Sequence, residues 1–350
     1  MKNRVHYIDN LRWMTISLLV IFHAAMAYNT WGEANYIFFK EVKPIAAIVT
    51  FISPWFMPLL FFLAGISAKY SLEKRGVKRF IKERIYRLGV PLVIGIAAIC
   101  TILSYIADVT HNFYKGNYFE HYKVFFTKYT DLTGYDGGFT FGHLWFLAVL
   151  IVVSLISCMI TKPVRYLPVV LYVLAVSCFD FKISGKPLLT YLFVYMLGYH
   201  LSGKKDFVKK AVKYKWIFVA VFITALAANT VLFIYIKDYE TLNNICNYAS
   251  FAAGLPALVL IGHDHLDFRN RITEVFSAIS YHFYILHFPV VVISQYLLNR
   301  AGLNIYMNFL LTLMISYPLT YFICLAVNRK KIKKIARAND ERCAGYKKSI

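Results

Sequence analysis

An arginine and a histidine of the first apolar stretch, Arg12 and His23, stand eleven residues apart. Eleven residues at about 100° each give three turns plus about 20°, so on a helix both side chains lie on one face, about 16 Å apart along its axis. An imidazole titrates near neutrality and can act as a general base or as a covalent carrier. Asp9, three residues before Arg12, can pair with the guanidinium. The spacing therefore predicts a site in which His23 does the chemistry while Arg12 and Asp9 orient it.

The depth of His23 favours a functional role. An ionisable side chain within a membrane span is costly unless it faces a polar cavity or a partner, so such a residue is functional by default. The simpler alternative for His23 is a structural histidine bonded to a neighbouring helix. For Arg12 the simpler alternative is an interfacial anchor, which is common at membrane edges.

The elements that must position these residues are membrane helices. Hydrophobic residues make up 59% of the 350 and charged residues 16%. The apolar stretches repeat at the length that a bilayer of about 30 Å requires, and long continuous runs in lipid are helical. We expect an all-α, polytopic membrane helix bundle with about ten transmembrane helices, at residues 11–28, 45–68, 88–107, 144–160, 164–179, 188–201, 216–236, 245–261, 273–298 and 305–327.

The basic residues predict the orientation of this bundle. If residues 1–12 are cytoplasmic, the segments on the same side hold 30 of the 39 Lys and Arg residues. Positive residues gather in cytoplasmic loops, so both termini are expected in the cytoplasm. The net charge of +21 thus reflects topology, and because it is scattered over short loops, nucleic-acid binding is not expected.

The domain organisation follows from the same pattern. We expect a single transmembrane domain at residues 1–328 and a basic cytoplasmic tail at 329–350. The N-terminal run has no small-residue cleavage site after a short apolar core, so it is expected to be a retained helix. The sequence contains no nucleotide-binding glycine loop and no zinc helix motif, and we expect no metal site.

Four further motifs accompany the Tyr7-x-Asp9-x-x-Arg12 opening and His23, and they follow one another along most of the chain. Together they resemble the acyltransferase-3 family of membrane O-acyltransferases, in which an Arg-x10-His first helix is the catalytic signature. Two of them, Arg84–Pro91 and His143–Leu147, are most similar to the branch that contains glucan biosynthesis protein C, a membrane succinyltransferase. The four motifs are Pro58–Gly65 (PLLFFLAG), Arg84–Pro91 (RIYRLGVP), Gly142–Leu147 (GHLWFL) and Ser280–Pro289 (SYHFYILHFP).

The resemblance implies roles for residues outside the first helix. Arg84 and Arg87 stand one helical turn apart at a cytoplasmic helix mouth, where two guanidinium forks could grip the phosphates of acyl-coenzyme A. Anchoring the bundle is the alternative for both, since residues 69–87 hold eight basic side chains.

Two more histidines are candidates for binding the substrate. His287 lies near the middle of the ninth predicted span, with Tyr284 on the same helical face. His143 and Trp145 open the fourth span from outside, where the resemblance implies an acceptor-side role. A packed histidine is the alternative for His287, and aromatic-belt anchoring is the alternative for His143 and Trp145.

These observations predict an enzyme of the class of acyltransferases that transfer groups other than aminoacyl groups. It would take an acetyl or succinyl group from cytosolic acyl-coenzyme A, a donor substrate rather than a bound cofactor, to a hydroxyl of an envelope glycan, glycolipid or related acceptor. His23 would act as base or as acyl carrier. We expect a multi-pass protein of a bacterial plasma or inner membrane, with the lipid bilayer as its surroundings and a homo-oligomer possible.

Two other classes of function remain open at this stage. One is a transporter or flippase for a lipid-linked or acyl substrate, because a polar first helix and Pro54 with Pro58 in the second span would suit a gated path. Against it, no Asp or Glu lies well inside a predicted span to couple protons. The other is a catalytically silent membrane subunit that only binds a partner.

Overall fold

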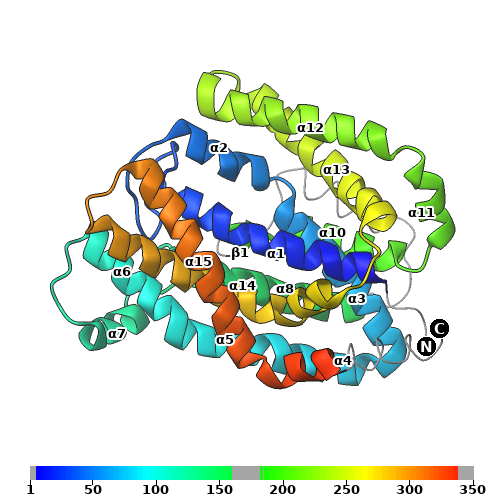
Figure 1. The fold of residues 1–350 in the computed structure, drawn as a ribbon, viewed down its shortest axis with the longest axis horizontal. Coiled ribbons are helices and arrows are strands. Elements are labelled where there is room, and N and C mark those ends of the chain that lie inside the picture. Colours follow the sequence, from blue (N-terminus) through cyan, green and yellow to red (C-terminus); the bar gives the residue numbers. More distant parts are fainter. Residues whose placement is uncertain (1–4, 160–181, 184, 338–350) are drawn as a thin grey trace.

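The computed structural model describes residues 5–159, 182–183 and 185–337 as a bundle of helices with one short antiparallel hairpin (Figure 1). The predicted all-α class is confirmed for this part of the chain. The helices are α1 (His6–Met26), α2 (Lys43–Ile52), α3 (Phe56–Arg75), α4 (Val77–Arg84), α5 (Val90–Gly95), α6 (Thr101–His111), α7 (Tyr118–Thr127), α8 (Trp145–Met159), α10 (Leu188–Leu201), α11 (Lys205–Val212), α12 (Lys215–Val231), α13 (Glu240–His265), α14 (Arg271–Asn299) and α15 (Ile305–Val327). Short π and 3-10 turns are η1 (Ile85–Gly89), η2 (Ile96–Cys100), η3 (Gly142–Leu144) and η4 (Leu232–Ile236), and the strands are β1 (Lys182–Ile183) and β2 (Lys186–Pro187).

Helices of membrane-spanning length dominate the described part of the chain. Seven helical stretches there are long and apolar enough to cross a membrane, and α10 is a shorter apolar helix. The predicted multi-pass helical architecture is thereby supported, while the count of about ten and the cytoplasmic termini stay predictions. The span predicted at 164–179 lies outside the described residues. The seven are Lys43–Arg75, Val77–His111, Gly142–Met159, Lys215–Ile236, Glu240–His265, Arg271–Asn299 and Ile305–Val327.

Helix α1 covers the first predicted span but is not one of these seven, because it carries too many polar side chains. It runs through the middle of the bundle and contacts α2, α3, α13, α14 and α15 (Figure 1). Side chains and loops fix it at both ends. The Asn10 amide donates to the carbonyl oxygens of Leu266 (2.7 Å) and Phe268 (2.9 Å), and the Gln295 amide donates to that of Ala24 (3.0 Å). Protein surrounds α1, so its polar groups meet partners rather than lipid.

Two predicted spans differ from the helices observed. The span predicted at 45–68 is broken between Ile52 and Phe56, where Pro54 sits in the turn that joins α2 to α3. Proline lacks the backbone N–H that would continue a helix, so the change of direction has a local cause. The span predicted at 88–107 begins earlier, at Val77, and it includes the π-helical turns η1 and η2.

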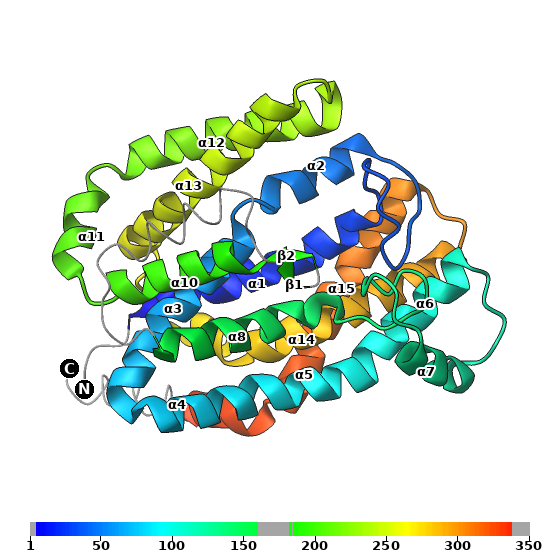
Figure 2. The same cartoon turned by 180° about the vertical axis from the view of Figure 1, so that it is seen from behind.

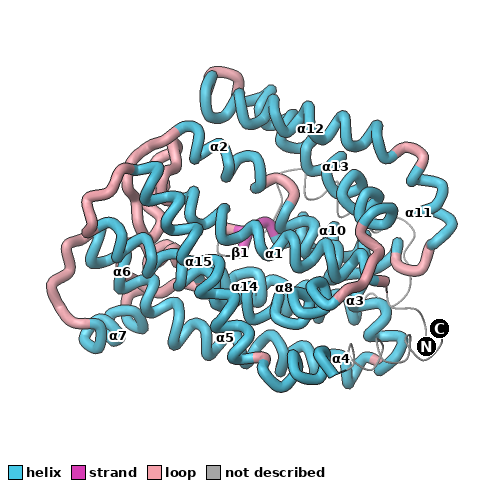
Figure 3. The backbone as a smooth tube through the Cα atoms, in the orientation of Figure 1, coloured by secondary structure: helices cyan, strands magenta, loops and turns pink. Residues whose placement is uncertain are grey.

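The loops gather at the two ends of the bundle (Figure 3). We name the ends after α1. The Arg12 end includes loop 266–270, where Asp267 accepts from the Tyr7 backbone N–H (3.0 Å). The His23 end includes loops 27–42 and 128–141, which are joined by a hydrogen bond from Tyr135 to Glu33 (2.6 Å). Viewed from behind, α12 and α13 form one edge of the bundle and α4, α5 and α6 the opposite edge (Figure 2).

Two glycines let α3 and α10 pack backbone to backbone. A Cβ atom added to Gly65 would overlap the carbonyl oxygen of Tyr195, and one added to Gly198 would overlap that of Phe62. Close approach at small residues is a common way for membrane helices to associate. Gly65 closes the Pro58–Gly65 motif, so this motif has a packing role.

We therefore expect Gly65→Ala to lower the free energy of unfolding by about 1–3 kcal/mol, because the backbones must separate to admit the methyl group. Gly89→Ala is the matched control, since a Cβ there meets only Ile85, at 3.9 Å. That helical substitution should be neutral or slightly stabilising. Thermal unfolding of the purified variants measures both, and equal melting temperatures for the two variants would contradict the packing argument.

Candidate active site

His23 lies near the end of α1 and stays partly exposed. Its ring stacks on Phe288 of α14 with centroids 4.0 Å apart, and it meets Phe22 edge-on at 5.2 Å. Two aromatic walls thus fix the plane of the imidazole while one side remains accessible. Such a ring can meet a substrate without rearrangement of the helix.

Two further histidines come together with His23. The centroid of His23 is 5.3 Å from that of His287 and 6.4 Å from that of His143, and the latter two are 5.3 Å apart. We call these three residues the imidazole cluster. They come from α1, η3 and α14, and His143 and His287 are buried. Across the described ranges, no group of three or more His, Cys, Asp or Glu side chains could hold a metal ion.

Hydrogen bonds to backbone carbonyls indicate which ring nitrogen of each buried histidine carries the proton. His143 Nε2 lies 2.9 Å from the Ile285 carbonyl oxygen, and His287 Nδ1 lies 2.7 Å from that of Tyr284. A carbonyl only accepts, so these two nitrogens are the donors. The other ring nitrogens, His143 Nδ1 and His287 Nε2, are buried without a hydrogen-bond partner in the described part of the chain. In the neutral rings they carry lone pairs that can accept a proton.

Tyr284 fixes the position of His143 relative to α14, the helix that carries His287. Its hydroxyl donates to the backbone carbonyl oxygen of His143, which ties α14 to η3. The side chain is buried and also contacts the ring of His143, with centroids 5.7 Å apart. Tyr284 thus positions His143 through the backbone.

A cavity of about 700 Å³ adjoins the imidazole cluster. It lies at the His23 end, because loop residues 31–36 and 131–135 form part of its lining. The lining that bears on the chemistry consists of His23, His143, Trp145, Lys186, Tyr284, Phe288, Trp31, Glu33, Asp131, Asn229, Phe233, Asn243, Asn244 and Asn247. The imidazole of His23 is therefore open to a space large enough for a sugar-sized ligand.

Lys186 of β2 brings a positive charge to this cavity. Its ammonium lies 5.3 Å from the centroid of the Trp145 ring, and its side chain lines the same cavity as His23. Burial lowers the pKa of Lys186 below its ordinary value, and the carboxylate of Glu33 opposes that shift. Trp145, predicted at the substrate side, thus supports a cation that faces the same cavity.

Arg12 and Asp9 form the pair that their spacing predicts. Arg12 Nη1 lies 3.0 Å from Asp9 Oδ1, while Nη2 donates to Ser67 Oγ (2.7 Å) and to the Leu63 carbonyl oxygen (3.3 Å). Both partners of Nη2 belong to α3. The guanidinium is therefore held in one orientation by two helices, about three turns below His23 on α1.

Arg84 and Arg87 have different surroundings. Arg84 is the last residue of α4 and lies over the Phe80 ring, 4.9 Å from its centroid. Arg87 is exposed in the π-helical turn η1, and its carbonyl oxygen accepts from the Tyr281 hydroxyl (2.5 Å). The π-helical turn η1 begins directly after Arg84 and contains Arg87, and a π turn is wider than an α turn. Their role in binding a donor stays a prediction.

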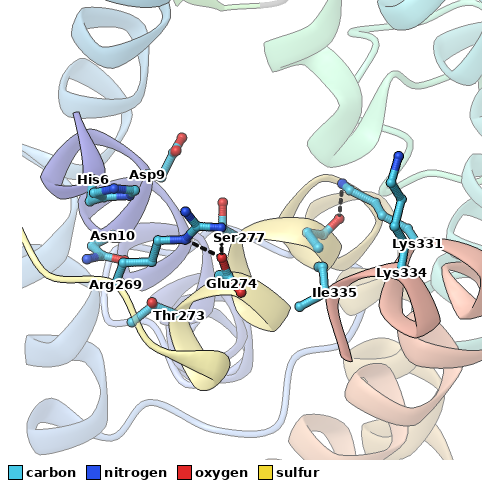
Figure 4. Close-up of a pocket in the computed structure, with 11 residues that line it drawn as sticks. His6, Asp9, Asn10, Arg269, Thr273, Glu274, Ser277, Lys331, Lys334 and Ile335 are labelled. Atoms are coloured by element: carbon cyan, nitrogen blue, oxygen red, sulfur yellow. Dashed lines mark hydrogen bonds and ion pairs between the residues drawn. The ribbon is translucent and has the colours of Figure 1, made fainter. Parts of the chain in front are cut away.

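A second cavity, of about 300 Å³, lies at the Arg12 end between α1, α14 and the segment after α15 (Figure 4). Asp9 and Asn10 line it from α1. Two of its basic side chains have partners: Arg269 pairs with Glu274, and Lys331 Nζ donates to the Ala278 carbonyl oxygen (2.8 Å). Through Asp9, this cavity adjoins the ion pair of Arg12 and Asp9 on its predicted cytoplasmic side.

The family of the chain follows from comparison with known sequences. A family model described as an acyltransferase domain, Acyl_transf_3, matches residues 5–329. The chain belongs to the acyltransferase-3 family. The match spans nearly the whole length of the chain, from the start of α1 to just after α15, so the family assignment includes every candidate site residue named above.

Curated proteins are similar to part of this chain. Proteins named glucans biosynthesis protein C from Salmonella paratyphi B, Salmonella heidelberg and Salmonella enteritidis PT4 are each 23% identical to it over 163 residues. The aligned segment covers 44% of this chain and 38% of each relative. The chain thus matches less than half of the length of these relatives. No solved structure matches it.

Sequence reasoning missed several residues of this acyltransferase-3 cavity. Lys186 lies in a short hairpin that no local pattern marks. Asn229, Asn243 and Asn247 are polar residues in apolar helices, and this contrast could have identified them. Of the residues singled out from sequence, His23, His143, Trp145 and Tyr284 line one cavity, and His287 lies behind it against His23 and His143. Arg12, Asp9, Arg84 and Arg87 do not line it.

Proposed function

We propose that this protein is a membrane O-acyltransferase that moves an acyl group from acyl-coenzyme A to a hydroxyl of an envelope glycan or related acceptor. One observation carries the proposal: His23 is partly exposed to a cavity of about 700 Å³, and two neighbouring imidazoles each hold a ring nitrogen without a partner in the described part of the chain. Family membership supports acyl transfer as the reaction class. The name of the curated relatives supports a glucan-like acceptor.

The chemistry needs one group that exchanges a proton. As a base, His23 takes the proton of the acceptor hydroxyl while its oxygen attacks the thioester carbonyl carbon. The carbon–sulfur bond breaks, and the proton passes to the coenzyme A thiolate. As a carrier, His23 is first acylated with release of the thiol, and the hydroxyl then displaces the imidazole. In either route, a lone pair on His143 or His287 can accept an N–H of His23 and so turn its other nitrogen toward the cavity.

The two substrates would approach from opposite sides. We propose about ten membrane spans with both termini in the cytoplasm of a bacterial cell, so that Arg12, Arg84 and Arg87 face the donor. The cavity at the His23 end would then receive the acceptor from outside. Arg12 would stabilise negative charge on the donor below His23, and Arg84 and Arg87 would contact its phosphates.

Lys186 bears on the identity of the acyl group. It is the one Lys or Arg among the described residues that line the cavity. A succinyl group carries a second carboxylate that this ammonium could hold, whereas an acetyl group has none. The charge therefore favours succinyl over acetyl as the transferred group.

The test uses purified protein in lipid nanodiscs with acyl-coenzyme A labelled in its acyl group and a glucose oligosaccharide. We expect label to move to the oligosaccharide as an alkali-labile ester, faster with the succinyl than with the acetyl donor. A protein that binds the donor but yields no ester with the oligosaccharide or any other hydroxyl compound would contradict the proposal. Oligosaccharide flux across vesicles without any donor would instead identify the transporter class.

A further inference from the structure

Four asparagine side chains form one wall of the cavity beside His23. Asn229 comes from α12, and Asn243, Asn244 and Asn247 come from α13, which packs along α12. Asn243 and Asn247 are four residues apart and so share a face of α13. We call Asn229, Asn243, Asn244 and Asn247 the amide wall. Each residue offers one carbonyl acceptor and two N–H donors to the same space.

The amide wall does not hold the two helices together. None of its side chains makes a hydrogen bond to the part of the chain that the structure describes, and Asn243 Oδ1 is buried without a partner. The side chain of Asn229 is buried, with 5% of its surface exposed. It lies seven residues before Ile236, the last residue of η4, which places it about 10 Å inside the end of that helix. A buried amide such as Asn229, or the buried Oδ1 of Asn243, is costly when nothing binds it, so these groups are better explained by a ligand in the cavity than by packing.

The aromatic rings beside the amide wall indicate the chemistry of the ligand that the wall would bind. The rings of Trp31 and Phe233 lie 5.7 Å apart, and both line the cavity together with the wall. Neutral amides bind vicinal hydroxyls by donating to one oxygen and accepting from the next, and aromatic rings pack on the apolar faces of sugar rings. A wall without charge beside aromatic rings suits a neutral, polyhydroxylated ligand.

We propose that Asn229, Asn243 and Asn247 bind a neutral sugar unit of the acceptor and thereby present one of its hydroxyls to His23. This inference rests on the proposed acyl transfer, which it deepens by assigning the acceptor subsite. Because the wall belongs to α12 and α13 and His23 belongs to α1, the sugar bridges the two sides of the cavity. The wall thus determines which hydroxyl reaches the imidazole.

Direct binding of a glucose oligosaccharide to donor-free protein tests the subsite apart from turnover. Asn229→Leu, Asn243→Leu and Asn247→Leu should each weaken binding by about tenfold, the equivalent of about 1.4 kcal/mol for a lost hydrogen bond. The intrinsic fluorescence of Trp31 and Trp145 provides the signal, with calorimetry as a second measurement. Asn299→Leu, at the exposed end of α14 outside the cavity, is the matched control and should bind as wild type does.

The outcomes separate this inference from the proposed function. Three leucine variants that bind the oligosaccharide as tightly as wild type would overturn the amide wall, even if acyl transfer is observed. Weakened binding in the variants, with no acyl transfer by wild type, would support the amide wall as a sugar-binding site and contradict the proposed acyltransferase activity. An aspartate substitution at the same position (Asn229→Asp, Asn243→Asp or Asn247→Asp) keeps the side-chain volume but removes the N–H donors, and it replaces any leucine variant that fails to fold. For that variant too, unchanged binding would count against the wall.

Discussion

Replacing His23 with alanine is expected to lower kcat for acyl transfer by about a thousandfold. General acid–base catalysis contributes about 10²–10⁴-fold, and no other imidazole of the cluster is open to the cavity to the same extent, since His143 and His287 are buried in the described part of the chain. The KM for the acceptor should change far less, because the imidazole acts on the reacting hydroxyl rather than on the sugar. Single-turnover transfer of labelled acyl groups in nanodiscs measures both quantities.

His265→Ala is the control for this experiment. His265 is an exposed imidazole at the end of α13, far along that helix from the amide wall, and its loss should leave kcat near the wild-type value. His23→Gln, which keeps a polar side chain in the same place, should be as inactive as His23→Ala, because an amide cannot take up a proton. If either His23 variant turned over at more than about a tenth of the wild-type rate while remaining folded, His23 would not be the reacting group.

The geometry of α1 could be predicted from sequence because helical periodicity fixes it. The relative positions of Arg12, Asp9 and His23 on the helix follow from their spacing and from the rise per residue. The ion pair between Arg12 and Asp9, at 3.0 Å, agrees with that prediction. The roles of these residues stay predictions. What the spacing could not predict is that Arg12 also donates to Ser67 and to the Leu63 carbonyl oxygen of α3.

The imidazole cluster could not be predicted as a cluster. His143 and Ile285 are 142 residues apart in the chain, and the bond between them depends on how η3 docks against α14. Each histidine taken alone had a plausible packing role. Only the tertiary structure brings them within about 5–6 Å of His23. The same limit applies to Lys186, whose hairpin has no pattern that points toward the cavity.

The backbone between Arg84 and Arg87 includes a turn that regular helical periodicity does not predict. A helical wheel assumes 3.6 residues per turn, whereas η1 is a π-helical turn that begins directly after Arg84. No sequence rule used for membrane spans anticipates such a turn. The π-helical turn is thus the part of the local geometry that the sequence did not predict, and the role of Arg84 and Arg87 in binding a donor stays a prediction.

Replacing Arg12 with methionine is expected to lower kcat/KM for the acyl donor by about a hundredfold. The guanidinium is the one cation placed on the same face of α1 as His23, and its fork is oriented by Asp9 and Ser67. A donor that brings negative charge toward His23 loses this partner in the variant. Arg12→Lys keeps the charge without the fork and should lose about tenfold. Donor-dependent initial rates at constant acceptor concentration measure the effect.

A structural role for Arg12 predicts a different pattern, because the residue also ties α1 to α3. Ser67→Ala removes the shorter of the two hydrogen bonds that form this tie but keeps the charge, so it should lower the free energy of unfolding by about 1 kcal/mol. If Arg12 only joined the helices, Ser67→Ala and Arg12→Met would shift the melting temperature and the donor kcat/KM in the same proportion. A loss of kcat/KM in Arg12→Met that increases with the negative charge of the donor, at equal stability, requires the guanidinium to act on the donor itself. Arg12 and His23, on one face of α1, then act in the same reaction. The guanidinium binds the negatively charged donor and so directs its acyl group to the imidazole of His23.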